Sequence, residues 1–191
     1  MKPHNINNKV NFMGGWYMED TSICDDLINF YEDSPNKKAG LTANRIDKKI
    51  KDSTDIEIDN VDMSTPIVNY LSILKETVNQ YKEIYFYCNK NTSPWGIKET
   101  FNLQKYNPNQ GFYGWHTERN SSANSLRHLV FMTYLNNVTD KGETEFYYQK
   151  LKIKPEKGLT LIWPTDWTFT HRGIVSSTQT KYIATGWYSF L

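Results

Sequence analysis

Hydrophobic residues recur at helical spacing in two segments of the first 95 residues. In residues 21–31, Ile23, Leu27 and Tyr31 fall on one face, which is the pattern of a helix packed against a core. Residues 65–82 carry a longer apolar stripe, and Pro66 suits the first position of a helix, where its missing N–H costs nothing. The pattern predicts one helix in each segment.

Between these helices the chain is polar. Residues 32–60 contain Pro35, Gly40 and many charged side chains, around a short strand-like run at residues 55–58. Long polar stretches are either disordered connections or functional segments such as active-site lids. Residues 36–60 are therefore a candidate lid.

After Trp95 the pattern changes to alternating, β-branched and aromatic runs bounded by Gly, Pro and Asn, which is typical of strands. The predicted strands cover residues 100–106, 114–118, 127–135, 144–149, 152–153, 158–163, 170–175 and 180–190. Short strands following two helices predict a mostly β fold, a double-stranded β-helix or jelly roll with the N-terminal helices packed on one sheet. We expect one domain over residues 1–191, with helical support and the lid in residues 1–95 and the jelly roll in residues 96–191.

Composition says more about the partners and cellular compartment of the protein than about the reaction it carries out. Lys and Arg number 22 against 21 Asp and Glu, so charge gives no reason to expect a nucleic-acid or membrane partner. Cys24 and Cys88 form no CxxC pair, the first residues lack an apolar segment, and no stretch approaches the length that crosses a bilayer. We expect a cytoplasmic protein. Frequent Asn, Lys and Ile indicate an AT-rich bacterial or phage genome, and a phage protein would act in the host cytoplasm.

The spacing of His116 and Glu118 is the first sign of chemistry. On a strand, residues two apart point the same way, so this imidazole and this carboxylate can bind one ion. His171, on a distant predicted strand, is the candidate third ligand. Two His and one carboxylate with open coordination positions suit a non-haem Fe(II) oxygenase, although zinc uses the same residue types.

Lys181 offers a cation for the same pocket. It shares one face of its predicted strand with Ile183, Thr185 and Trp187, because alternate residues of a strand point the same way. A strand lysine is usually solvated, but one beside Ile183 and Trp187 is more consistent with an inward position and an anionic partner.

Five stretches of the C-terminal half together resemble a known family. They are residues 106–118 (YNPNQGFYGWHTE), 127–136 (RHLVFMTYLN), 142–146 (GETEF), 154–163 (KPEKGLTLIW) and 171–188 (HRGIVSSTQTKYIATGWY). In this order they resemble the prolyl 4-hydroxylase branch of the Fe(II)/2-oxoglutarate-dependent dioxygenases, including its short bacterial and phage members. The resemblance implies a single dioxygenase domain.

The resemblance also implies residue roles. His116, Glu118 and His171 match the iron ligands, and Lys181 matches the residue that pairs with the distal carboxylate of 2-oxoglutarate. The other matched positions are Tyr106, Tyr134 and Thr185 for the cosubstrate pocket, and Tyr113, Arg127 and Trp187 around the target proline. Residues 36–60 occupy the place of the family's mobile loop.

Two positions depart from the family pattern. The usual motif is His-x-Asp, and Glu118 is one methylene longer, so its carboxylate must approach a metal from a different angle. Arg127 and Tyr134 differ by seven positions and fall on opposite faces of a regular strand. Arg127 therefore needs a strand end or a twist to take its family role.

The implied function is hydroxylation of an unactivated C–H bond, with a peptidyl proline as the favoured target and release of succinate and CO2. Fe(II), 2-oxoglutarate and O2 are the implied cofactors, with ascorbate as a stimulant, and a proline-containing protein or peptide is the expected partner. One alternative keeps the chemistry on another substrate, such as a free amino acid, another protein side chain or a nucleobase. The other is a catalytically silent metal-binding jelly roll. Turnover of 2-oxoglutarate separates the two classes.

Overall fold

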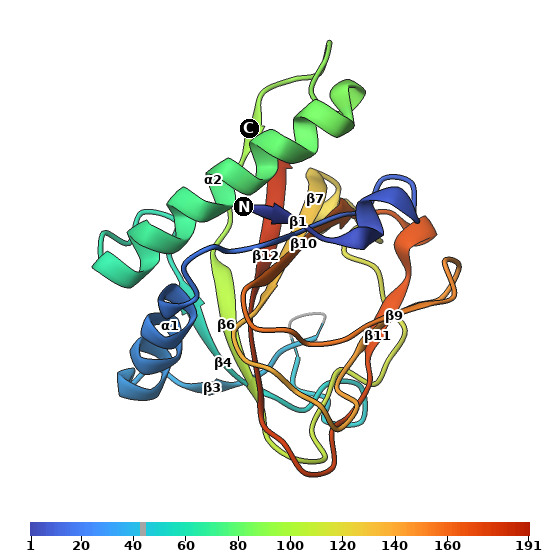
Figure 1. Cartoon of the computed structure of the whole chain (residues 1–191). Helices are drawn as coiled ribbons and strands as arrows, with labels where there is room; N and C mark the ends of the chain where they lie inside the picture. The colour runs from blue at the N-terminus through green and yellow to red at the C-terminus, as the bar shows by residue number, and fades with distance from the viewer. Residues whose placement is uncertain (43–44) are drawn as a thin grey trace.

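The computed structural model describes residues 1–42 and 45–191. Its framework is a pair of facing sheets, with two helices on the outer side of the larger one (Figure 1). The larger sheet has the order β1-β2-β10-β7-β12-β6-β4-β3, with β5 also paired to β12, and the smaller sheet has the order β11-β8-β9. Antiparallel pairing joins the strands throughout. The predicted jelly roll with supporting helices is confirmed.

The elements of the larger sheet come from the whole length of the chain. They are β1 (Lys2–Pro3), β2 (Gly14–Tyr17), β3 (Lys38–Ala39), β4 (Thr54–Ile58), β5 (Trp95–Gly96), β6 (Phe101–Tyr106), β7 (Arg127–Tyr134), β10 (Leu159–Pro164) and β12 (Lys181–Phe190). The smaller sheet consists of β8 (Thr144–Phe146), β9 (Leu151–Ile153) and β11 (His171–Gly173). Short 3-10 turns are η1 (Asn5–Asn8), η2 (Phe86–Cys88), η3 (Ser122–Asn124) and η4 (Trp167–Phe169).

The two helices form where the apolar stripes predict them. Helix α1 (Ser22–Asp33) buries Leu27 and Tyr31, and α2 (Thr65–Ile84) begins with a proline in its first turn. Tyr70 of α2 reaches the sheet, where its hydroxyl lies 2.9 Å from the hydroxyl of Thr133. Burying these faces against the sheet, rather than helix propensity, holds both helices in place. In the described part of the chain, neither helix has the length and apolar character needed to span a bilayer.

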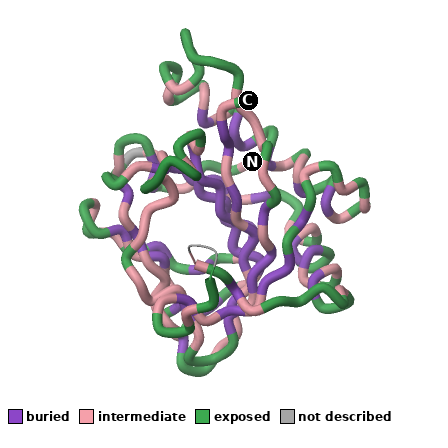
Figure 2. The backbone as a smooth tube through the Cα atoms, turned by 180° about the vertical axis from the view of Figure 1, so that it is seen from behind, coloured by how far each residue is buried: buried purple, intermediate pink, exposed green. Residues whose placement is uncertain are grey.

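Alternation along the central strands separates two interiors. Phe101 and Leu103 of β6 join the apolar core beneath the helices, while Asn102, Gln104 and Tyr106 face the space between the sheets. Strand β12 follows the same rule, and its cavity-facing residues are Lys181, Ile183, Thr185 and Trp187, as predicted. The central strands are largely buried and the peripheral loops exposed (Figure 2). One face of each strand thus builds the core and the other builds a site.

The first 95 residues contribute more sheet than the sequence analysis predicts. Strand β2 pairs with β10 in the main sheet, although its Gly14-Gly15 pair is typical of a turn. A Cβ on Gly14 would lie 2.3 Å from the ring of Trp16, so these glycines permit close packing rather than chain reversal. Local sequence carried no signal for this long-range pairing.

The candidate lid, residues 36–60, includes residues 43 and 44, which lie outside the described residues. Its last part is β4, which pairs along its length with β6 and is therefore integral to the main sheet. The described part before β4 holds β3 and the buried Lys51. Closure of this segment over a substrate stays a prediction.

Candidate active site

His116 and His171 meet through their backbones. The strand predicted over residues 114–118 is wrong, because these residues form a loop with only an isolated antiparallel bridge between His116 and His171. The N–H of each residue donates to the carbonyl of the other, at 3.0 and 2.9 Å. The Thr117 hydroxyl also donates to the carbonyl of Thr165, at 2.6 Å. The loop therefore presents its side chains from a fixed backbone despite not being a strand.

Three side chains converge at one point in this region. The Nε2 atoms of His116 and His171 lie 3.4 and 3.5 Å from Oε1 of Glu118. One ligand atom from each residue lies within 4.8 Å of the other two. The Nδ1 atoms donate to the carbonyls of Gly114 and Phe169, at 3.0 and 2.9 Å. Because Nδ1 carries the proton, each Nε2 directs a lone pair toward the shared point, as a metal ligand requires.

The protonation states of the cluster also suit a metal. Burial, together with the proximity of His171, lowers the pKa of His116, so this imidazole is neutral at neutral pH. Burial alone would raise the pKa of Glu118, but the interactions of its carboxylate with the two neighbouring histidines outweigh burial and hold that pKa well below its usual range. Metal binding requires neutral imidazole and ionised carboxylate, and the residues present therefore fit a divalent cation.

Aromatic rings enclose the two imidazoles. The ring of Phe112 stacks on His116 with centroids 3.6 Å apart and planes 4° from parallel. The rings of Phe146 and Trp163 pack against His171, with centroids 5.4 and 5.2 Å away. These contacts restrict the rotamers of both histidines and keep the site partly dry. Phe112 lies within the matched segment 106–118 but was not predicted as a site residue.

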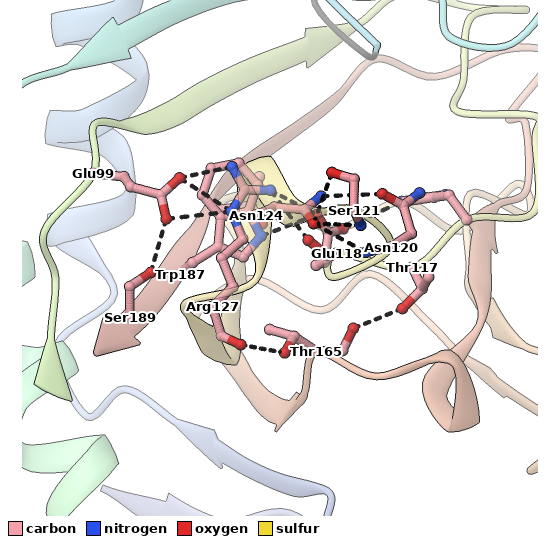
Figure 3. Close-up of polar contacts among 12 residues, drawn as sticks. Glu99, Thr117, Glu118, Asn120, Ser121, Asn124, Arg127, Thr165, Trp187 and Ser189 are labelled. Atoms are coloured by element: carbon pink, nitrogen blue, oxygen red, sulfur yellow. Dashed lines mark hydrogen bonds and ion pairs between the residues drawn. The ribbon is translucent and has the colours of Figure 1, made fainter. Parts of the chain in front are cut away.

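Glu118 uses its two oxygens differently. While Oε1 faces the histidines, Oε2 accepts a hydrogen bond from Nε1 of Trp187 at 2.9 Å. Arg127 lies beside the same oxygen, with Nη1 3.8 Å from Oε2, and Nη1 donates to the backbone carbonyl of Glu118 at 3.3 Å. Figure 3 shows Arg127 between Glu99 on one side and Glu118 on the other. Sequence reasoning missed Glu99, which has no motif of its own.

Arg127 reaches the cavity because β7 is irregular at its start. Ser189 pairs with Arg127 while the preceding Tyr188 pairs with Leu129, so β7 has one extra residue, His128, at this point. Such a bulge shifts the alternation of the strand by one. Arg127 and Tyr134 can therefore lie on the same face of β7, although residues seven apart fall on opposite faces of a regular strand. His128 instead points toward the helices, where its Nε2 lies 2.9 Å from the carbonyl of Cys88.

Lys181 lies in the same cavity as the three candidate ligands, and the cavity has a volume of about 630 Å³. The side chain is 6% exposed, and its Nζ donates to the carbonyl of Gly142 at 2.8 Å. Burial lowers the pKa of Lys181 to about 8, and the nearby Glu143 opposes this shift. An ammonium group has three donors, so Lys181 is a desolvated cation with capacity for an anionic ligand.

Two of the three predicted cosubstrate residues line the cavity with Lys181. The ring of Tyr106 lies 5.2 Å from Nζ of Lys181, and its hydroxyl donates to Oε1 of Gln104 at 2.7 Å. Thr185 also lines the cavity, and its hydroxyl donates to the carbonyl of Phe131 at 3.0 Å.

Tyr134 lies behind the cavity rather than in its lining. Its ring is fully buried in the core between the sheets, and its hydroxyl donates to Oγ1 of Thr144 at 2.7 Å. Thr144 itself does line the cavity. The structure thus places Tyr134 one side chain away from the space a cosubstrate would occupy.

The three predicted substrate residues do not gather in one place. Arg127 and Trp187 line the cavity, whereas Tyr113 lies outside its lining and donates its hydroxyl to the carbonyl of Asn109 at 2.8 Å. The Cζ atom of Arg127 lies 3.4 Å from the ring centroid of Trp187, so one face of that ring is already covered. A proline ring could stack only on the other face.

A buried ion pair forms part of the cavity wall and was not predicted. Nζ of Lys51 lies 2.6 Å from Oδ2 of Asp55, and both side chains are less than a tenth exposed. Gln104 donates to the same carboxylate oxygen at 3.3 Å and accepts from Tyr106. Hydrogen bonds thus link the candidate lid segment to the wall next to Lys181. In the sequence Lys51 and Asp55 resemble any other charged pair of a polar stretch.

Comparisons with known proteins agree with this geometry. Residues 101–189 match the family model of the 2OG-Fe(II) oxygenase superfamily. No curated protein sequence matches the chain. The match covers β6 to β12, the part of the chain that carries the three candidate ligands and Lys181.

Solved structures with the same fold include three prolyl hydroxylases. A viral collagen prolyl hydroxylase from Paramecium Bursaria Chlorella virus-1 is 19% identical, with a TM-score of 0.69 over 95% of this chain and 97% of that one. A prolyl-4-hydroxylase from Pseudomonas putida is 14% identical, with a TM-score of 0.73 over 93% and 92% of the two chains. A prolyl hydroxylase from Trichoplax adhaerens, solved with a hypoxia-inducible-factor peptide, is 18% identical, with a TM-score of 0.73 over 96% and 89%.

The jelly-roll core of this chain, residues 101–189, is thus similar in sequence to the 2OG-Fe(II) oxygenase superfamily. The chain also has the fold of the three prolyl hydroxylases, and this likeness extends over the N-terminal helices and strands as well. At these identities the structural likeness establishes the fold, and the reaction and substrate must be argued from the site.

Proposed function

We propose that this chain is an Fe(II)- and 2-oxoglutarate-dependent dioxygenase that hydroxylates a peptidyl proline, releasing succinate and CO2. One observation carries the proposal: a two-histidine, one-carboxylate cluster and a buried lysine line a single cavity. The cluster suits a divalent metal with open positions, and the lysine suits an anion. A 2-oxo acid that binds the metal at one end and carries a carboxylate at the other needs both within one pocket.

His116, Glu118 and His171 would hold the iron. Their Nε2 lone pairs and Oε1 already face one point, so binding would require little rearrangement of the side chains. When bound, iron together with 2-oxoglutarate and O2 supplies the oxidation of the C–H bond. The protein's own part is to fix the ligands, orient the reactants and exclude water from the aromatic-walled site.

Lys181 would bind the distal carboxylate of 2-oxoglutarate. The charged lysine is destabilised by burial, and an anion beside it would relieve that cost. Tyr106 and Thr185 would line the same end of the cavity. Tyr134 would act indirectly, by holding Thr144 in the lining.

A polypeptide substrate is supported by the surface around the cavity as well as by the fold. Arg172 lines the cavity, and its Cζ lies 4.4 Å from the ring centroid of the exposed Trp115. Exposed aromatic rings continue from there through Tyr147 and Tyr148 to Trp167, with successive centroids 5.1, 5.2 and 5.7 Å apart. A run of exposed aromatic side chains suits an extended, proline-rich segment flanking the target residue.

Succinate release by the purified chain tests the proposal. The assay contains Fe(II), ascorbate and 2-oxoglutarate, with or without proline-containing peptides, and His116→Ala is the control because it removes a ligand. The proposal expects turnover that peptide stimulates and the control lacks. Turnover that peptides leave unchanged would keep the dioxygenase and move the substrate to a free amino acid, another side chain or a nucleobase. No turnover by iron-loaded protein would indicate a silent metal-binding jelly roll.

A further inference from the structure

The contacts of Glu118 account for its extra methylene. A glutamate has one more rotatable bond than an aspartate, so an unrestrained Glu118 could turn either or both oxygens toward a metal. Here Oε2 accepts from Nε1 of Trp187 at 2.9 Å, which leaves Oε1 facing the two histidines. The carboxylate is therefore fixed so that one oxygen is presented and the other is held by the protein.

Arg127 is close enough to Glu118 to disturb this arrangement. Its Nη1 already forms a long ion pair with Oε2, at 3.8 Å, and a small rotation of the guanidinium would turn it into a close, hydrogen-bonded pair. Such a pair would compete with a metal for the negative charge of Glu118. Something must therefore restrain the guanidinium.

Glu99 supplies that restraint. Its Oε2 accepts from Nε and Nη2 of Arg127 at 3.1 and 2.7 Å, and Ser189 donates to its Oε1 at 2.8 Å. Glu99 is ionised at neutral pH: burial opposes ionisation, but hydrogen bonds from Arg127 and Ser189 lower its pKa. A two-point pair of this kind fixes both the position and the plane of a guanidinium. It also stacks Arg127 on Trp187, which in turn aims the indole N–H at Glu118.

We propose that Glu99, Arg127 and Trp187 are positioning residues that make Glu118 a one-oxygen metal ligand, with Glu99 keeping Arg127 from neutralising it. This inference rests on the proposed metal centre. It assigns Arg127 and Trp187 a role toward the metal ligand, beside or instead of the substrate contacts that the family resemblance implies. It also gives Glu99, which lies ahead of the matched segment, a function in the site.

Metal binding by the metal-free full chain provides the first test. The dissociation constant for Co(II) is measured by titration calorimetry for the unaltered chain, Glu99→Gln and Trp187→Phe. Glu99→Gln keeps the shape of the side chain and removes its charge, and Trp187→Phe keeps an aromatic ring but removes the indole N–H. Partners of metal ligands typically contribute about 10–100-fold to affinity, and a weakening of that size is expected for both variants. A changed visible Co(II) spectrum is expected too, because Glu118 would bind through a different number of oxygens.

Glu145→Gln is the matched control. Glu145 pairs with Arg172 at 2.8 Å, so the variant also breaks an Arg–Glu pair beside the cavity, but one that does not touch Glu118. Its Co(II) affinity and spectrum should equal those of the unaltered chain. Thermal unfolding of the metal-free variants shows whether each one folds.

Glu118→Asp separates positioning from general damage. The shorter side chain cannot reach both Trp187 and the point shared by the histidines, so the proposal expects it to bind Co(II) more weakly than Glu118 does. In that background, Trp187→Phe should cause no further loss. Equal losses in both backgrounds would overturn the inference, as would Glu99→Gln and Trp187→Phe variants that bind Co(II) as Glu145→Gln does. Failure of the unaltered chain to bind Co(II) would instead overturn the proposed metal centre.

Discussion

The two ends of the cavity are built on different principles. At the Glu118 end, one carboxylate oxygen, both Nδ1 atoms and the neighbouring guanidinium have protein partners, and the Nε2 lone pairs and Oε1 converge without a proton between them. At the Lys181 end, a buried ammonium has one carbonyl partner among the described residues. The first end presents lone pairs and a negative charge that suit a cation, and the second holds a cation that burial destabilises and an anion would stabilise. The two ends of the cavity therefore suit two different ligands, a cation at Glu118 and an anion at Lys181.

Removing the carboxylate should have the largest effect. Glu118→Ala deletes a direct ligand and leaves the indole of Trp187 and the guanidinium of Arg127 facing the histidines. Because even indirect partners contribute about 10–100-fold, the Co(II) dissociation constant should rise by more than about 100-fold. Titration calorimetry measures this, and Co(II) binding at the original affinity would show that the metal lies elsewhere.

At the opposite end, Lys181→Met should abolish recognition of the anion while leaving the metal site intact. Losing one partner of a buried charge pair costs about 3 kcal/mol, which corresponds to about a 100-fold weaker affinity for 2-oxoglutarate. The measurement is the dependence of succinate release on 2-oxoglutarate concentration, with Co(II) affinity as the control. An unchanged dependence would remove Lys181 from the cosubstrate site.

The same substitution should stabilise the ligand-free chain. The pKa of Lys181 falls from 10.5 to about 8 on folding, so at pH 7 the folded state carries the full cost of a buried charge. Allowing about 1 kcal/mol for the lost bond to Gly142, Lys181→Met should raise the free energy of unfolding by about 2 kcal/mol. Denaturant titration without ligand measures this difference.

The pH dependence of the free energy of unfolding tests whether the buried charge of Lys181 causes this difference. Between about pH 8 and 10.5 the unfolded chain binds the lysine proton and the folded chain does not, so this group makes stability rise with pH. The advantage of Lys181→Met should therefore shrink as the pH rises through that window. A constant advantage would point to packing rather than charge.

The smallest effect is expected at Tyr134, behind the lining. Tyr134→Phe removes the bond to Thr144 and should lower the free energy of unfolding by about 1 kcal/mol. The dependence of its succinate release on 2-oxoglutarate concentration should stay close to that of the unaltered chain. A loss comparable with that of Lys181→Met would instead place Tyr134 in direct contact with the cosubstrate.

The sequence analysis predicted the parts of the fold that depend on local periodicity. Both helices, the shared face of Lys181, Ile183, Thr185 and Trp187, and the jelly-roll class follow from side-chain spacing. Strand β2 was not predicted, because its pairing with β10 joins segments far apart in the chain and only the ring of Trp16 packed on Gly14 explains that glycine. The predicted strand at residues 114–118 was wrong for a related reason, since contacts with His171 and Thr165, rather than a strand ladder, hold that loop.

Sequence alone determined which side chains could serve as two imidazole ligands, a carboxylate ligand and a buried cation, because residue type and spacing limit what a side chain can do. Only the tertiary structure decided how they are used. The extra residue in β7 points Arg127 into the cavity. There its guanidinium donates to Glu99, and the indole N–H of Trp187 donates to one oxygen of Glu118. These outcomes depend on which groups meet across the fold and on which of several possible partners is nearest, and neither is encoded in the local pattern of residues.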